Sequence, residues 1–270
     1  MGKIQLQGCQ NTRDLGGIKT KDGRKIKEKK LIRSGALFSA TESDLHILTE
    51  QYDLRAIIDL RTIPEMEGKP DPQIEGVTYY ANPVLEEFED QKTGEKVKNM
   101  PKKNPLQDAI DRANGLPDDT KGFMKSIYPQ LVEREHCIQA YKNFFQYLLK
   151  QEDGAILWHC SEGKDRVGVG TMLLLTALGV DMEEIKRDYI YTNNCIYDEV
   201  TMLLGAVSRL ASNRLLEEKI MYMLTVDPEY LEEVLSSIEK RYGSVEKFLQ
   251  EAMELTDEDI EQLREKYLEA

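Results

Sequence analysis

The sequence predicts an α/β domain in which a mostly parallel central sheet is flanked by helices. Short β-like runs in the first third of the chain are separated by turn residues, and a helical stretch lies between the first two runs. Near the middle, an apolar strand leads through a loop into an apolar helix. Alternation of strand and helix is typical of a parallel sheet. We expect residues 1–270 to form one domain, because this length suits a single large core.

The first third supplies three strands and one helix. Thr41 and Asp44 predict the start of a helix over Glu42–Gln51, because a hydroxyl N-cap and an acidic residue three positions later satisfy free amides of the first turn. The strands are predicted over Lys30–Arg33, Arg55–Leu60 and Gly76–Tyr80.

A charged segment, about 86–135, then interrupts the strand and helix pattern. It contains Pro101, Pro105 and Pro117 with several lysines, and its helical periodicity is weak except around Leu106–Ala113. Long segments of this kind inside a domain are often functional, so we interpret it as a helical lid insertion.

Regular structure resumes with a helix over Glu133–Lys150, whose apolar residues recur at helical spacing. The apolar run Ala155–Trp158 predicts a buried strand that delivers a loop to a helix over Val167–Leu178. About 181–270 is predicted as additional C-terminal helices, over Met182–Asn193, Asp198–Ser212, Pro228–Arg241, Ser244–Met253 and Asp257–Leu268.

Composition excludes several classes of protein. A net charge of −13 argues against nucleic acid as a partner, and no run approaches the roughly 20 apolar residues of a membrane span. No secretory signal is recognisable, so a cytoplasmic location is expected, although unconventional export stays open. The four cysteines have neither the close pairing nor the neighbouring histidines of a zinc site, which predicts reduced thiols and no metal.

The segment His159-Cys-Ser-Glu-Gly-Lys-Asp-Arg166 carries the chemistry. A loop of this length between strand and helix can turn its amides toward a phosphate dianion, and the helix directs its positive end to the same place. Arg166 can add a bidentate contact, and the positive field favours the thiolate of Cys160 as a nucleophile. We expect no cofactor, because these groups neutralise the phosphate. The predicted substrate-binding residues of the loop and helix are Ser161, Glu162, Gly163, Lys164, Val167 and Gly168.

Two carboxylates are candidates for the general acid. Asp165 lies within the loop and needs no distant segment to reach the substrate. Asp59 ends a predicted strand, and the carboxyl ends of parallel strands share one edge, so Asp59 and Arg61 are also expected near Cys160. A structural ion pair between Asp59 and Arg61 is the competing interpretation.

At this point the sequence resembles the bacterial tyrosine and phosphoinositide phosphatases related to mycobacterial protein tyrosine phosphatase B and the Listeria lipid phosphatase. Besides the loop, the similar segments are Asn11–Gly17, Arg33–Leu37, Ile58–Arg61 with Pro64 and Glu65, and Tyr242–Ser244. The resemblance covers most of the chain and implies the cysteine-phosphatase fold. It also implies Cys160 as nucleophile, Arg166 as phosphate binder, Asp165 as acid and base, and Lys164 as a contact for further anionic groups.

Two positions depart from that pattern. Val167 stands where many tyrosine phosphatases carry Ser or Thr, which predicts slow breakdown of the phosphocysteine unless Ser161 substitutes. Glu162 adds a carboxylate to a loop that must hold a dianion, so its side chain is expected to point toward solvent.

The expected substrate is a phosphotyrosine protein, a phosphoinositide or both, and the oligomeric state is left open. One competing hypothesis is a catalytically weak module that binds phosphorylated ligands, although such a module would not need Cys160. A rhodanese-like sulfur transferase would also use a loop cysteine, but the spacing to Arg166 and the Lys164–Asp165 pair favour phosphate.

Overall fold

The computed structural model describes residues 2–86, 104–211 and 213–270. Within these ranges a six-stranded sheet has the order β1-β2-β3-β6-β4-β5, and four neighbouring strands, β3, β6, β4 and β5, run parallel. The predicted α/β class is confirmed, and the predicted strands lie within two residues of the observed ones. The strands are β1 (Gly2–Lys3), β2 (Arg13–Asp14), β3 (Leu31–Ser34), β4 (Leu54–Asp59), β5 (Thr78–Ala81) and β6 (Ala155–His159).

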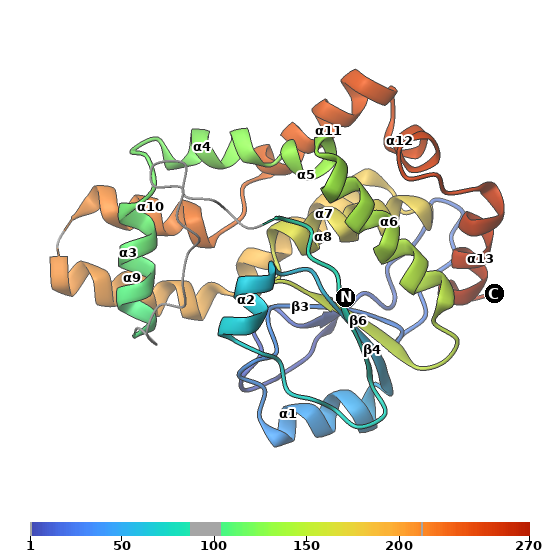
Figure 1. Cartoon of the computed structure of the whole chain (residues 1–270), viewed down its shortest axis with the longest axis horizontal. Helices are drawn as coiled ribbons and strands as arrows, with labels where there is room; N and C mark the ends of the chain where they lie inside the picture. The colour runs from blue at the N-terminus through green and yellow to red at the C-terminus, as the bar shows by residue number, and fades with distance from the viewer. Residues whose placement is uncertain (1, 87–103, 212) are drawn as a thin grey trace.

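Alternating side chains of the sheet enter two different cores. Ile156 and Trp158 of β6 belong to the larger core, whereas Leu157 belongs to a smaller core on the opposite face, as the two-residue period of a strand requires. The helix α1 (Glu42–His46), which continues as the π-helical turn η1 (Ile47–Gln51), covers the smaller core, and α6 and α7 cover the larger one (Figure 1). The capping box of Thr41 and Asp44 is present at the start of α1.

The helices in the second half of the chain that pack in the larger core agree with the predicted helices. They begin and end within two residues of the predictions. They are α6 (Glu135–Lys150), α7 (Asp165–Ala177), α8 (Met182–Cys195), α11 (Pro228–Tyr242), α12 (Val245–Glu251) and α13 (Asp257–Tyr267). Within the described ranges, no helix combines the length and the apolar character that crossing a membrane requires.

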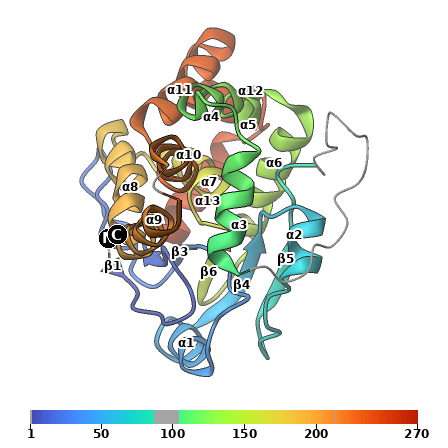
Figure 2. The ribbon, with the colours of Figure 1, turned by 90° about the vertical axis from the view of Figure 1, so that its left-hand side faces the viewer.

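Three helices form a separate lobe beside the sheet, seen on the left of Figure 1 and facing the viewer in Figure 2. They are α3 (Pro105–Asn114), α9 (Tyr197–Ala211) and α10 (Arg214–Leu224). Ala113, Val207, Leu216 and Ile220 make a third hydrophobic cluster between them. The lobe therefore combines part of the predicted insertion with helices from the C-terminal third.

The predicted insertion corresponds only partly to described structure. Residues 87–103, including Pro101, lie outside the described residues. The rest forms α3, α4 (Thr120–Ile127) and α5 (Gln130–Glu133). The helix predicted around Leu106–Ala113 is α3, whereas α4, α5, α10 and the short α2 (Ile63–Gly68) were not predicted individually. The interpretations as a lid and as a single domain remain predictions.

Burial of α13 in the larger core makes its contribution to stability testable. Leu263 is fully buried there, so Leu263→Ala should lower the free energy of unfolding by about 2–5 kcal/mol, the usual cost of a core cavity. Leu215→Ala is the matched control, because Leu215 is 41% exposed and its loss should change the same quantity by less than about 0.5 kcal/mol. Urea denaturation measures both, and equal effects would show that α13 contributes nothing to the core.

Candidate active site

Three parallel strands end together at one edge of the sheet. In the strand register Ser34 of β3 and Asp59 of β4 are both partners of His159 of β6. Cys160 follows His159 directly, so the loop emerges where the carboxyl ends of β3, β4 and β6 meet. This edge is where open parallel sheets place ligands.

The loop bends sharply at Gly163, which has a positive φ of 68°. A Cβ atom at this position would lie 2.5 Å from the Ser34 carbonyl oxygen, so the close approach of β3 requires glycine. The Gly163 carbonyl accepts hydrogen bonds from Asn11 Nδ2 at 2.9 Å and from Arg33 Nη2 at 3.0 Å. Residues from two distant segments thus fix the loop from inside the protein.

The helix α7 begins immediately after the loop, which places Asp165 and Arg166 in its first turn. The thirteen-residue helix therefore directs the free amides of its N-terminus toward the loop. Cys160 is buried, with only 2% of its surface exposed. This arrangement supplies the strand, loop and helix context predicted for a phosphate site.

Arg166 is held by Glu65 of α2. Its Nη1 donates to Glu65 Oε2 at 2.6 Å and its Nη2 donates to Oε1 at 3.0 Å, while the Ser161 hydroxyl also donates to Oε1. Burial would raise the pKa of Glu65, but the hydrogen bonds and charge of Arg166 outweigh it and hold that pKa far below its usual range. Glu65 therefore stays ionised and orients the guanidinium of Arg166.

Asp165 is tied to its neighbours through one carboxylate oxygen. Its Oδ1 accepts a short hydrogen bond from the Tyr128 hydroxyl and lies 3.2 Å from Lys164 Nζ. Tyr189 in turn donates to Tyr128 at 2.9 Å. Burial and the negative charge of Asp165 raise the pKa of Tyr128, so its hydroxyl keeps the proton that it donates.

Lys164 does not line an open rim. It is 2% exposed, and its Nζ donates to the Thr225 carbonyl at 3.3 Å besides contacting Asp165. Glu162 is half-buried, and its carboxylate lies 3.8 Å from Arg112 of α3. The lobe of α3, α9 and α10 therefore lies beside the loop.

The other predicted residues of α7 are packing positions. Val167 is fully buried in the larger core. A Cβ on Gly168 would approach the Tyr189 ring to 3.0 Å, so glycine allows α8 to pack closely against α7.

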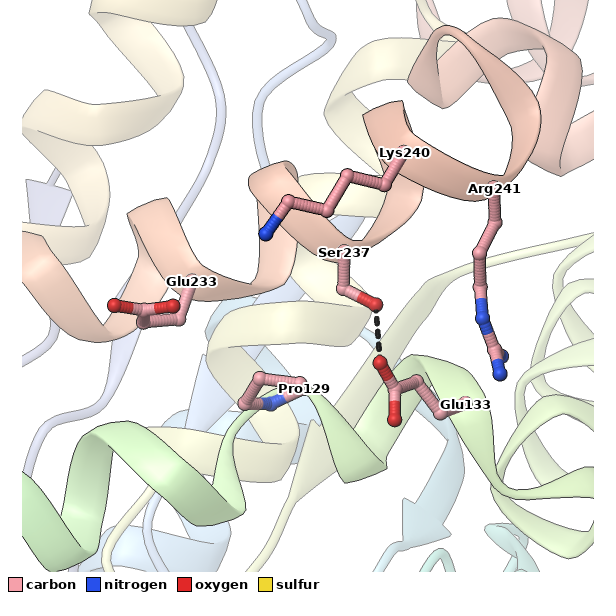
Figure 3. A pocket seen from close by; sticks show the side chains of 6 residues that line it. All are labelled: Pro129, Glu133, Glu233, Ser237, Lys240 and Arg241. Atoms are coloured by element: carbon pink, nitrogen blue, oxygen red, sulfur yellow. Dashed lines mark hydrogen bonds between the residues drawn. The ribbon is translucent and has the colours of Figure 1, made fainter.

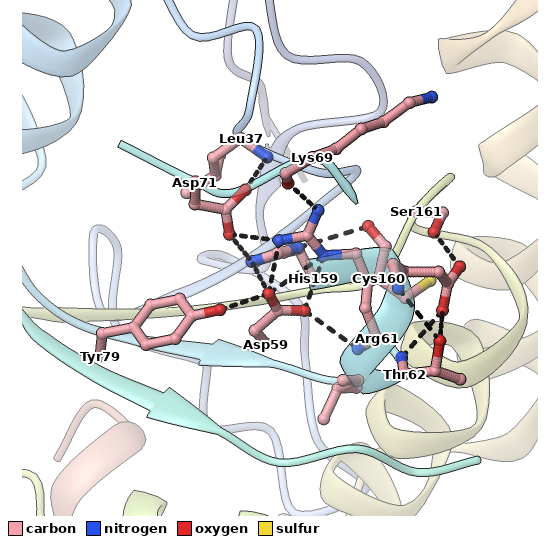
Figure 4. A network of polar contacts seen from close by, with 12 residues as sticks. Leu37, Asp59, Arg61, Thr62, Lys69, Asp71, Tyr79, His159, Cys160 and Ser161 are labelled. Carbon is pink, nitrogen blue, oxygen red and sulfur yellow. Dashed lines mark hydrogen bonds and ion pairs between the residues drawn. The ribbon is translucent and has the colours of Figure 1, made fainter. Parts of the chain in front are cut away.

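Asp59 and Arg61 lie in a buried ion network beneath the loop (Figure 4). Arg61 Nε and Nη2 contact both oxygens of Asp59, and Nη2 also lies 3.0 Å from Asp71. His159 Nε2 lies 2.8 Å from Asp71, and Tyr79 donates to Asp59. Asp59 is fully buried and satisfied by these partners, which supports the ion-pair interpretation over a role as acid.

The oxygen and nitrogen atoms of Asp59, Asp71 and His159 that could ligate a metal lie within 4.8 Å of one another. The guanidinium of Arg61, however, already contacts both carboxylates and provides the positive charge there. These residues therefore fit a metal ion poorly.

Two hollows lie elsewhere on the described part of the chain. One lies between α5 and α11 (Figure 3), and within it Ser237 donates a hydrogen bond to Glu133. It is lined by Pro129, Glu133, Glu233, Ser237, Lys240 and Arg241. A second hollow contains Thr176 and Gly179 at the far end of α7. Neither contains a residue of the predicted site.

Sequence reasoning did not assign roles to several residues that the structure brings to the loop. Glu65 was noted only within a similar segment, and its position three residues after the N-cap Thr62 was the local signal for α2. Tyr128 and Arg33 come from segments far away in the chain, and neither has a local pattern that indicates its contact with the loop.

Comparison with known proteins agrees with this geometry. The model of the tyrosine phosphatase family matches residues 4–269. The chain therefore belongs to the tyrosine phosphatase family, and it is a phosphatase. The resemblance inferred from the loop and the N-terminal segments is confirmed.

Two relatives match over nearly the whole chain. One, from Cupriavidus necator and named as a tyrosine-protein phosphatase, is 29% identical over 262 residues, which cover 96% of this chain and 85% of the relative. The other, the triple specificity protein phosphatase PtpB of Mycobacterium tuberculosis, is 25% identical over 93% of this chain and 94% of its own length. A tyrosine-protein phosphatase of Nostoc commune is 44% identical over 54 residues, which are 20% of this chain and 18% of that protein.

The geometry at Gly163 predicts a strong effect of a single methyl group. Gly163→Ala should lower kcat/KM at least about tenfold, because a side chain at positive φ costs about 1–2 kcal/mol and the new Cβ displaces β3 or the loop. Gly205→Ala on α9 is the control, since a Cβ there meets no atom within 4 Å. Steady-state kinetics on p-nitrophenyl phosphate measure both, and equal activity of the two variants would contradict the required bend.

Proposed function

We propose that this phosphatase hydrolyses phosphomonoesters through a phosphocysteine intermediate on Cys160. The observation that carries the proposal is the position of Cys160 between the end of β6 and the first turn of α7, which contains Arg166, oriented by Glu65. Amides, helix end and guanidinium together match the charge and shape of a phosphoryl group.

In the first step the Cys160 thiolate attacks phosphorus, so that an S–P bond forms and the P–O bond to the leaving group breaks. Asp165 gives its proton to the departing oxygen. Arg166 and the loop amides stabilise the equatorial oxygens of the transferred group. In the second step water attacks phosphorus, Asp165 takes its proton, and the S–P bond breaks to release phosphate and restore the thiolate.

The contacts of Asp165 suit this double role. Tyr128 and Lys164 both approach Oδ1, and this leaves Oδ2 as the oxygen to face a leaving group. The side chain is 30% exposed, so substrate and water can reach it, in contrast to the fully buried Asp59. Asp165 is therefore the acid that we propose.

We propose a phosphotyrosine protein as the substrate. Phosphoinositides are the second candidate, which the resemblance to the tyrosine and phosphoinositide phosphatases implies. Lys164 is buried, so it is not free to bind a second phosphate of a phosphoinositide. We therefore rank phosphotyrosine above phosphoinositides, in line with the tyrosine phosphatase family.

Replacement of the nucleophile tests the mechanism. Cys160→Ser should lose phosphate release from p-nitrophenyl phosphate, a phosphotyrosine peptide and soluble phosphoinositides, because an alcohol is a much weaker nucleophile at neutral pH. The assay contains a chelator, and the relative rates of the wild type rank the substrates. A wild type that binds phosphate without turnover would support a binding module instead.

The two carboxylate candidates can be separated by isosteric variants. Asp165→Asn should lower kcat/KM about 10²–10⁴-fold on phosphotyrosine, and less on p-nitrophenyl phosphate, whose leaving group departs without a proton. Asp59→Asn should instead lower the free energy of unfolding, since it breaks a buried ion pair with Arg61. If the dependence on leaving group appears in Asp59→Asn and not in Asp165→Asn, the assignment is wrong.

A further inference from the structure

A buried ion cluster contacts the phosphate loop from inside the protein. Asp188 of α8 accepts from Arg13 Nε at 2.9 Å through one oxygen and from Arg33 Nη1 through the other. Arg33 also donates from Nη2 to the Gly163 carbonyl at 3.0 Å. All three charged side chains are at most 1% exposed.

The charges in this cluster do not balance. Two guanidinium groups share one carboxylate, which leaves one positive charge in a place without access to water. Isolated buried charges are costly, so buried cations are normally paired with anions. Moreover, Arg33 Nε is buried and has no hydrogen-bond partner among the described residues.

The thiolate of Cys160 is the candidate for the negative charge that this cluster lacks. Arg33 lies beside Trp158 in the register of β3 and β6, two residues before Cys160. Burial and the charge of Arg13 lower the pKa of Arg33 to about 10, whereas the negative charges of Asp188 and Cys160 oppose this decrease. In general a buried cation favours an anion close to it over the neutral form.

We infer that Arg33 is a positioning residue of the phosphatase centre, which holds the loop at Gly163 and supplies a buried positive charge that stabilises the Cys160 thiolate. The inference rests on the proposed role of Cys160 as nucleophile. It adds the buried guanidinium of Arg33 to the cations of the centre, besides Arg166 and Lys164.

Other ionisable groups face the same thiolate and loop. They come from the loop itself, from the end of α4, and from α2, β2, β6, α6, α7 and α8. They are Glu65, Arg13, Tyr128, His159, Tyr141, Glu162, Lys164, Asp165, Arg166, Asp188 and Tyr189. Substitution of Arg33 leaves all of them in the chain, so a comparison of variants isolates the charge at position 33.

The pH dependence of Cys160 alkylation by iodoacetamide tests the inference without turnover. The thiolate reacts and the thiol does not, so the midpoint of the rate against pH reports the ionisation of Cys160. Burial, with the charges of Asp44 and Asp71, raises the pKa of Cys9 to about 12, and burial also raises the pKa values of Cys137 and Cys195. Cys160→Ser supplies the background.

Arg33→Gln should raise the alkylation midpoint by about one pH unit, which makes alkylation below the midpoint about tenfold slower. Arg33→Lys retains the charge and should restore at least half of that shift. Asp188→Asn removes the opposing carboxylate and should move the midpoint in the opposite direction. Arg55→Gln is the control, because Arg55 is half exposed and paired with Asp53, and it should leave the midpoint unchanged.

The outcomes separate this inference from the proposed function. A wild type whose alkylation and turnover do not depend on Cys160 would overturn the proposed function. If Cys160 is the nucleophile but Arg33→Gln keeps the wild-type midpoint, or Gln and Lys shift it equally, the electrostatic role of Arg33 is wrong. If Arg33→Gln does not fold by circular dichroism, Asp188→Asn decides, and an unchanged or raised midpoint in that variant overturns the inference.

Discussion

The two hydrogen bonds to the Gly163 carbonyl are the constraint on which the rest of the site depends. Asn11 and Arg33 pull this carbonyl inward, and the residue can accept that geometry only because glycine adopts a positive φ next to β3. The turn sets the path of the loop, which in turn sets where α7 begins and where Arg166 lies. Hydrogen bonds to one backbone carbonyl of the loop thus help to place both Cys160 and Arg166.

Preorganisation extends from the backbone to the charged side chains. Glu65 holds Arg166 in a bidentate contact and also accepts from Ser161, so the guanidinium is already oriented before substrate arrives. Ordering a long cationic side chain costs about 0.5–1.5 kcal/mol of conformational entropy, and here that cost falls on folding instead of binding.

The fold could be predicted from local patterns, whereas much of the site could not. Periodicity located β6 and α7, and the spacing from Cys160 to Arg166 lies within one segment, so no distant contact was needed to find the loop. Arg33, Tyr128 and Glu65 contact the loop across separations of up to 130 residues. Lys164 was expected to contact further anionic groups, but it is buried, and its Nζ donates to the carbonyl of Thr225, which is 61 residues away. Such contacts arise from tertiary packing, for which one sequence carries no periodic signal.

The net charge of −13 opposes the approach of an anionic substrate, so the positive charges near the loop must attract it locally. Acidic phosphoproteins are repelled by the whole chain at distances within the Debye length of about 8–10 Å, so long-range steering does not favour their approach. The attraction must therefore come from groups at or under the loop, where burial reduces screening. Under the proposed function, this role falls to Arg166, the amides of α7 and the unbalanced charge of Arg13, Arg33 and Asp188.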